Sequence, residues 1–204
     1  FIGRWKFGQL RGWIAAGRTN ARLSMYRWTM IIEWVLTLGF LLWWQALGRT
    51  AGEAGLGWGI EGWQWIPVAV GLGMVVFLIA QLVTTLRNPQ ELRQARDKMA
   101  GVEALIPRTS GERTAFTALS VTAGVCEEIL YRGLLMGSLL PVIGLWPSGV
   151  ASSVIFGLGH AYQGQAGILK TGTVGLVMAL LVVFSGSLWT AIVVHAVLDI
   201  TSGR

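Results

Sequence analysis

After Arg113 the chain contains only eight Asp, Glu, Lys, Arg or His side chains, and six of them fall into three short blocks. Such side chains are costly in apolar surroundings and are therefore candidates for function. Glutamate, histidine and aspartate can transfer protons and stabilise a charged intermediate, so we expect chemistry at these blocks. The eight residues are Glu127, Glu128, Arg132, His160, Lys170, His195, Asp199 and Arg204.

The first block contains two adjacent glutamates that have different local partners. Glu128 and Arg132 are four residues apart, so they share a helix face and can form an ion pair. Glu127 has no such basic neighbour, and an unpaired carboxylate in an apolar site is suited to act as a general base. We predict chemistry for Glu127 and structural support from Glu128 and Arg132. The alternative is that Arg132 neutralises both carboxylates and the group only holds helices together.

The second and third blocks each place a histidine four residues from a possible partner. Phe156 and His160 share one helix face, as do His195 and Asp199. Asp199 could accept a hydrogen bond from His195 and fix the tautomer of the ring. The alternatives are structural: His160 as a hydrogen-bonding strut, and a His195–Asp199 pair that only locks the last helix.

Small residues repeat every four positions beside two of these blocks. Gly149, Ser153 and Gly157 precede His160, and the pair Gly133 and Gly137 follows Arg132. Small residues at this spacing let the backbones of two membrane helices approach closely. We therefore expect this packing to bring the second block against the helix that carries the first.

The composition indicates a membrane protein. Apolar residues make up 53% of the 204 residues and charged residues 13%, and the mean hydropathy is +0.59. A soluble domain averages about 25% charged residues, so this chain has too little charge to cover a surface in water. We interpret the net charge of +6 as a signal of membrane orientation and expect the lipid bilayer, not nucleic acid, as a partner. The single cysteine, Cys126, excludes an intramolecular disulfide.

The predicted fold class is an all-α, polytopic transmembrane helix bundle of about six spans with a four-helix catalytic core. We expect three parts: a basic N-terminal arm (1–27), two spans with a basic cytoplasmic loop (28–113), and the catalytic core (114–204). The arm could be an amphipathic helix on the membrane surface or a disordered tail. The expected spans are 28–47, 63–86, 114–140, 147–160, 168–184 and 188–200.

Basic residues predict how these spans are oriented. Six precede Trp28 and six more lie between Arg87 and Arg113, whereas the connection from Gly48 to Gly62 has only Arg49. Since basic loops stay in the cytoplasm, we expect an integral protein of the plasma membrane with both termini cytoplasmic.

The three blocks together resemble the CAAX protease and bacteriocin-processing family, often labelled CPBP or Abi, of glutamic intramembrane endopeptidases. Its pattern is Glu-Glu followed by Arg, then Phe-x-x-x-His, then His-x-x-x-Asn/Asp. It is matched here by Glu127, Glu128 and Arg132, by Phe156 and His160, and by His195 and Asp199. The resemblance covers roughly residues 114–202.

The resemblance implies a peptidase in which Glu127 activates a water that His160 helps to hold. His195 and Asp199 would stabilise the oxyanion, with no metal and no other cofactor. Many members carry asparagine at the position of Asp199, and an ionised aspartate only accepts hydrogen bonds. We therefore expect Asp199 to act by orienting His195. The implied substrate is a membrane-anchored protein or peptide, which could carry a lipid.

Two other functions use the same residues. Glu127, His160 and His195 could bind zinc in a hydrolase with an open position for water, although His-Glu-x-x-His is absent from the sequence. Alternatively, the cluster could be a proton relay or binding site in a membrane protein that is not an enzyme, such as a transporter or a bacteriocin-immunity protein.

Overall fold

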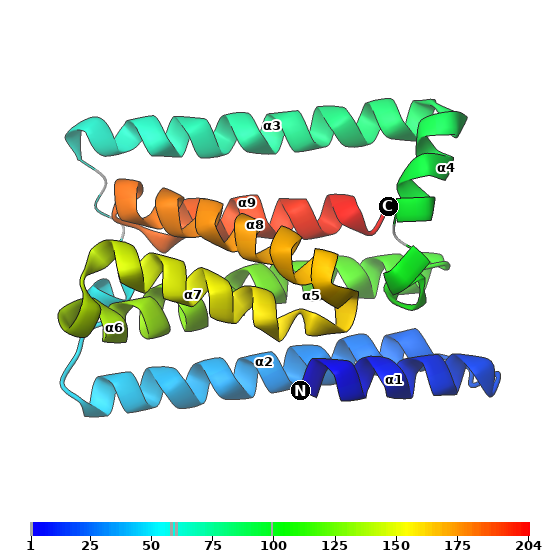
Figure 1. The fold of residues 1–204 in the computed structure, drawn as a ribbon, viewed down its shortest axis with the longest axis horizontal. Coiled ribbons are helices and arrows are strands. Elements are labelled where there is room, and N and C mark those ends of the chain that lie inside the picture. Colours follow the sequence, from blue (N-terminus) through cyan, green and yellow to red (C-terminus); the bar gives the residue numbers. More distant parts are fainter. Residues whose placement is uncertain (1, 58, 60, 99) are drawn as a thin grey trace.

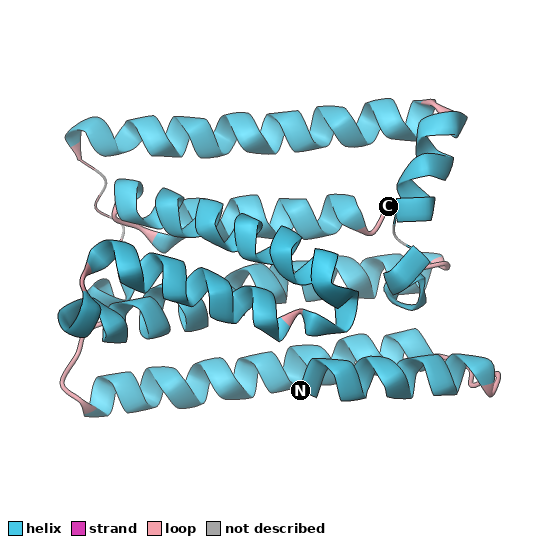
Figure 2. Cartoon of the chain, in the orientation of Figure 1, coloured by secondary structure: helices cyan, strands magenta, loops and turns pink. Residues whose placement is uncertain are grey.

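The computed structural model describes residues 2–57, 59, 61–98 and 100–204, and this part of the chain contains helices and no strand (Figure 2). The predicted all-α class is confirmed. The helices are α1 (Ile2–Ala15), α2 (Ala21–Ala46), η1 (Gly52–Leu56), η2 (Gly62–Gln64), α3 (Trp65–Arg87), α4 (Pro89–Lys98), η3 (Ala100–Leu105), α5 (Ser110–Glu128), η4 (Ile129–Leu135), α6 (Met136–Ile143), α7 (Leu145–Gly159), η5 (Ala161–Gln163), α8 (Gly164–Ser185) and α9 (Leu188–Ser202).

The long helices run back and forth along one axis (Figure 1). Each of the six expected spans corresponds to a helical stretch, and the third continues from α5 through η4 into α6. The η4 segment is a π-helix, a wider turn that is often found at functional sites. It begins directly after Glu128, so the wider turn lies beside the first block of charged residues.

Three helices are long and apolar enough to cross a membrane: Ala21–Ala46, Gly62–Arg87 and Ala161–Ser185. Two shorter apolar helices, Leu145–Gly159 and Leu188–Ser202, complete the apolar set. Many large apolar side chains are exposed, among them Leu42 on α2 and Phe77 on α3. Large exposed apolar surfaces of this kind suit contact with lipid. The chain is therefore an integral membrane protein.

The N-terminal arm is helical, as in one of the two predicted alternatives, and it packs on the bundle. Helix α1 runs back alongside the first part of α2 (Figure 1). Phe7 and Leu10 are buried, and the ring of Phe7 lies 5.6 Å from that of Tyr162 on η5. These apolar side chains, three residues apart, therefore find their contacts on the bundle itself.

The connection between α3 and α5 contains a helix that the sequence did not predict, α4. The η3 segment of this connection is fixed to α2. Arg22 donates a hydrogen bond to the carbonyl of Ala104 at 2.9 Å, and Tyr26 donates one to the carbonyl of Leu105. Arg22 also lies 3.9 Å from Glu112, near the start of α5. These contacts hold the first turns of α2 and α5 side by side.

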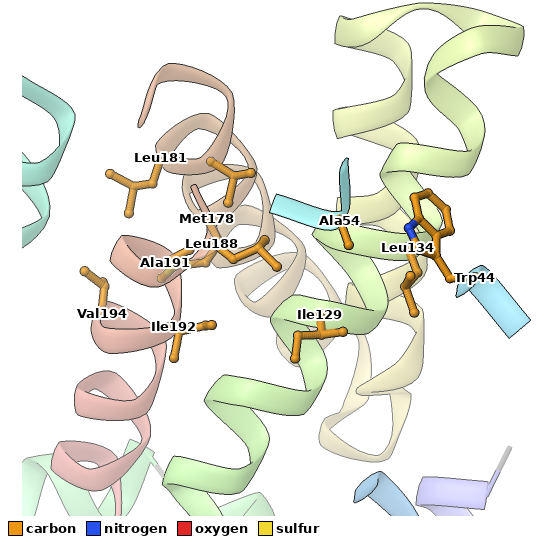
Figure 3. Packing of buried hydrophobic residues seen from close by; sticks show 11 residues of the cluster. Trp44, Ala54, Ile129, Leu134, Met178, Leu181, Leu188, Ala191, Ile192 and Val194 are labelled. Atoms are coloured by element: carbon orange, nitrogen blue, oxygen red, sulfur yellow. The ribbon is translucent and has the colours of Figure 1, made fainter. Parts of the chain in front are cut away.

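The main hydrophobic core joins η1, η4, α8 and α9 (Figure 3). Leu188, at the start of α9, is fully buried, and Ala54 of η1 packs close to it. Ile129 directly follows Glu128, and Ile192 lies one turn before His195. The core is thus next to the charged residues and fixes the helices that carry them.

Candidate active site

The site is built on a buried ion pair at the junction of α5 and η4. Arg132 Nη1 donates to Glu128 Oε1 at 3.0 Å, and neither side chain is exposed. The predicted pair is therefore present. Arg132 Nη2 also donates to the carbonyl of Gly175 on α8 at 2.8 Å. A Cβ atom at Gly175 would lie 2.9 Å from Nη2, so the arginine requires glycine there.

His195 on α9 is held by Glu128 and not by Asp199. Its Nδ1 lies 2.7 Å from Glu128 Oε1. Because a carboxylate accepts, Nδ1 donates this hydrogen bond. Asp199 Oδ2 is 3.8 Å from Nε2, which is beyond hydrogen-bond distance. We predicted that Asp199 accepts the hydrogen bond that orients the ring, and this prediction is wrong because Glu128 accepts it. The ring turns toward the carboxylate that is fully buried, whereas the side chain of Asp199 is 39% exposed.

Glu127 lies on the other side of the same imidazole. Its Oε2 is 3.7 Å from His195 Nε2, and 18% of its side chain is exposed. Nε2 therefore faces two carboxylates, from Glu127 and Asp199, while Nδ1 is occupied by Glu128. The exposed fraction rises from Glu128 through Glu127 to Asp199, so the site is closed at Glu128 and opens toward Asp199.

His160 lies at the end of α7, with its ring fixed by its own helix. Its Nδ1 is 2.9 Å from the carbonyl oxygen of Phe156, which can only accept, so Nε2 is left with a free lone pair. The rings of His160 and Phe156 are 4.8 Å apart, and the Phe156 ring meets that of His195 edge-on at 5.8 Å. The guanidinium of Arg132 lies 4.5 Å from the same ring. The buried Phe156 therefore connects all three blocks.

The small-residue stripes pack against other helices than expected. A Cβ atom at Gly157 would lie 2.7 Å from the carbonyl oxygen of Ile168, so this stripe packs α7 on α8. Gly133 packs instead on Ala54 of η1. The link between α7 and the first block is polar and aromatic: Ser152 donates to the carbonyl of Tyr131 at 2.7 Å. The stripe that we expected against the helix of the first block therefore packs on α8 instead.

A different glycine sets the distance between α5 and α9. A Cβ atom at Gly124 would lie 3.0 Å from the backbone nitrogen and the side chain of Ala196, and 3.0 Å from the carbonyl oxygen of Ile192. Gly124 is one turn before Glu128, and Ala196 follows His195. This position was missed, although the sequence has a signal for it, because Ser120 and Gly124 are small residues four apart on the face of Glu128.

The structure adds to the site one carboxylate that lies outside the three blocks. Glu33 on α2 is half-buried, and its Oε2 is buried without a hydrogen bond from the described residues. It interacts electrostatically with Glu127, Asp199 and His195. The sequence could have indicated a function for Glu33, because it is the only charged residue of the first predicted span.

The residues proposed for zinc do not form a metal site. Among the described residues, no group of three or more His, Cys, Asp or Glu side chains could hold a metal ion. Glu127, His160 and His195 therefore do not fit the zinc alternative.

The site is thus a buried cluster of carboxylates and a histidine within a helical membrane bundle. Residues 110–201 match the model of one family, described as type II CAAX prenyl endopeptidase Rce1-like. This match confirms the resemblance and supports a CAAX-type intramembrane peptidase. The match covers α5 to α9 and leaves out α1 to α4. No curated protein and no solved structure matches the chain significantly.

Proposed function

We propose that the protein is an intramembrane endopeptidase in which Glu127 activates a water molecule against a peptide bond. The side chain of Glu127 is partly exposed, and its Oε2 lies 3.7 Å from His195 Nε2, so it can accept a proton from water. His160 offers its Nε2 lone pair as a second acceptor for the same water. The water proton then moves to Glu127 while the water oxygen bonds to the carbonyl carbon, and the π electrons of the carbonyl group move to its oxygen to form an oxyanion.

His195 stabilises the oxyanion that forms in this step. With protons on both ring nitrogens, His195 donates one hydrogen bond to Glu128 and directs the other, from Nε2, toward the oxyanion. Glu128 is itself fixed by Arg132, so a rotation of the ring would break a buried hydrogen bond to a fixed carboxylate. Asp199 lies on the Nε2 side at the open end of the site, where it favours the orientation of that N–H.

One observation carries this proposal: His195 is fixed through Nδ1 by a buried carboxylate, while Nε2 faces Glu127. A His195–Asp199 pair that only locks the last helix would not need a second helix to supply the fixing carboxylate. The family match adds the reaction class.

The substrate is a membrane-anchored protein or peptide that reaches the site from the bilayer, and the family description suggests a prenylated protein. We also propose that the protein lies in the plasma membrane with both termini in the cytoplasm, because basic residues gather in the N-terminal arm and between α3 and α5.

The test uses a cleaved reporter peptide with purified protein in lipid vesicles. Glu127→Gln should reduce kcat by about 10²-fold or more, because general-base catalysis is worth that much. His160→Ala should also reduce kcat. Wild-type cleavage by either variant would contradict the proposal, and activity that is lost on chelation and restored by zinc would favour the metal alternative.

A further inference from the structure

One face of α2 packs along the helix that carries Glu127, and Glu33 lies on that face. With Glu33 included, the residues of this face are separated by four or seven positions, which places them on one side of a helix. Glu33 is seven residues after Tyr26 and four before Thr37. The other members are Arg22 against Glu112, Tyr26 against Phe116, Thr37 beside Cys126 and Trp44 against Gly137.

This register places Glu33 at the level of the reacting groups. Thr37, one turn further, lies beside Cys126, which directly precedes Glu127. Glu33 interacts electrostatically with Cys126 as well as with three site residues. The titratable groups around it, taken from every neighbouring helix, are Cys126 and Glu127 of α5, Tyr131 of η4, Tyr162 of η5, and His195 and Asp199 of α9.

Glu33 has no basic partner of its own among the described residues. Arg132 is bound to Glu128, and His195 is shared by Glu127, Glu128 and Asp199. The Oε2 atom of Glu33 is buried and accepts no hydrogen bond from the described residues. A buried carboxyl group that lacks such partners and lies near other carboxylates is favoured as the neutral acid. Glu33 therefore brings a proton to a site whose base, Glu127, must begin without one.

We propose that Glu33 is a catalytic acid that protonates the leaving amine. This inference rests on the proposed peptidase function. Glu127 takes a proton from water as the oxygen–carbon bond forms, and His195 holds the oxyanion. The carbon–nitrogen bond then breaks, its electron pair stays on nitrogen, and nitrogen takes the proton of Glu33. The proton on Glu127 returns to Glu33 through water, which restores both groups.

The test compares an amide with a thioester. The probes are a reporter peptide and the same peptide with its scissile amide replaced by a thioester, cleaved by the purified protein in lipid vesicles. An amide nitrogen must be protonated before it leaves, whereas a thiol ionises near pH 8.5 and leaves as the thiolate. Glu33→Gln should therefore lower kcat for the amide about 10²-fold or more. The thioester rate should change by less than about 3-fold, since Glu33→Gln removes only a proton donor.

Two further variants keep the test decisive. Glu33→Asp retains an acid proton at shorter reach, so its amide rate should lie between the wild type and Glu33→Gln while its thioester rate is unchanged. Thr37→Val, on the same face of α2, is the matched control and should leave both rates close to the wild type.

An unchanged amide rate in Glu33→Gln, or an equal fall for both substrates in Glu33→Gln or Glu33→Asp, overturns the inference. Glu127→Gln separates this failure from that of the proposed function. If Glu127→Gln cleaves both substrates like the wild type, the peptidase mechanism itself is wrong. If Glu127→Gln loses both reactions and Glu33→Gln keeps both, only the role of Glu33 is wrong.

Discussion

Glu127 and Glu128 are neighbours in the sequence with opposite surroundings. Glu128 is completely buried and accepts from both Arg132 and His195 through Oε1. Glu127 is partly exposed and has only a 3.7 Å contact with His195. The same substitution at these two positions should therefore have different consequences.

Glu128→Gln should lower the free energy of unfolding by about 3–5 kcal/mol, because it leaves Arg132 as a buried charge without its partner. Glu127→Gln should change the free energy of unfolding by less than about 1 kcal/mol, since it breaks no hydrogen bond of the described residues. Thermal unfolding of both variants in detergent measures this difference. Each variant is the control of the other, and equal stabilities would contradict the assignment.

The residue types of the site could be predicted from the sequence, but not all of their partners. Spacing within one helix correctly gave the pair of Glu128 and Arg132. The same rule gave Asp199 as the partner of His195, whereas the bond goes to Glu128, which is 67 residues away. A spacing of four shows which residues share a face, and only the packing of α5 on α9 shows which buried acceptor the ring meets.

At the scale of helices, Gly124 controls the distance between α5 and α9. Gly124→Ala adds a methyl group where Ala196 and the carbonyl of Ile192 lie at 3.0 Å, so the two helices must separate by a few tenths of an ångström. The bond between His195 and Glu128 should lengthen, and kcat should fall about 10-fold or more, since small misplacements of catalytic groups are costly.

Gly73→Ala on α3 is the matched control, because nothing lies within 4 Å of a Cβ atom there. It should leave cleavage unchanged and raise stability by up to about 1 kcal/mol through helix propensity. Reporter cleavage and thermal unfolding of both variants are the measurements. Full activity of Gly124→Ala would show that the α5–α9 distance does not limit the reaction.

Hydropathy placed the helices well but could not say which of them pack together. The stripe before His160 allowed close packing, and its partner is α8 because Ile168 and Gly172 meet Gly157 there. A small residue permits any helix to approach, so the stripe carries no information on its partner. Helix α4 was missed because its residues are polar and lie in a stretch expected to be a loop.

At the scale of the whole molecule, the orientation in the membrane can be tested with single cysteines. Ala51, between α2 and α3, and Gln94, on α4, are both exposed. The α2–α3 connection and α4 lie at opposite ends of the bundle (Figure 1). The natural Cys126 is fully buried and gives a low background.

In intact cells, a membrane-impermeant thiol reagent should label Ala51→Cys, because its connection is poor in basic residues. Gln94→Cys should react only after the cells are permeabilised. The same reagent on the protein with Cys126 alone gives the background. The reverse labelling pattern would show that the bundle is inserted the other way round.

The π-helical turn at Ile129–Leu135 bears on where the length of the chain can change. A π-turn holds about one residue more than an α-turn. Deletion of one residue within this segment would close the wide turn to an α-turn, which absorbs the deletion and keeps α6 in phase with α5. Deletion of one residue in the regular helix α5 would instead rotate the helices that follow by about 100°. During evolution, a gap of one residue among related chains should therefore fall within Ile129–Leu135 and not within α5.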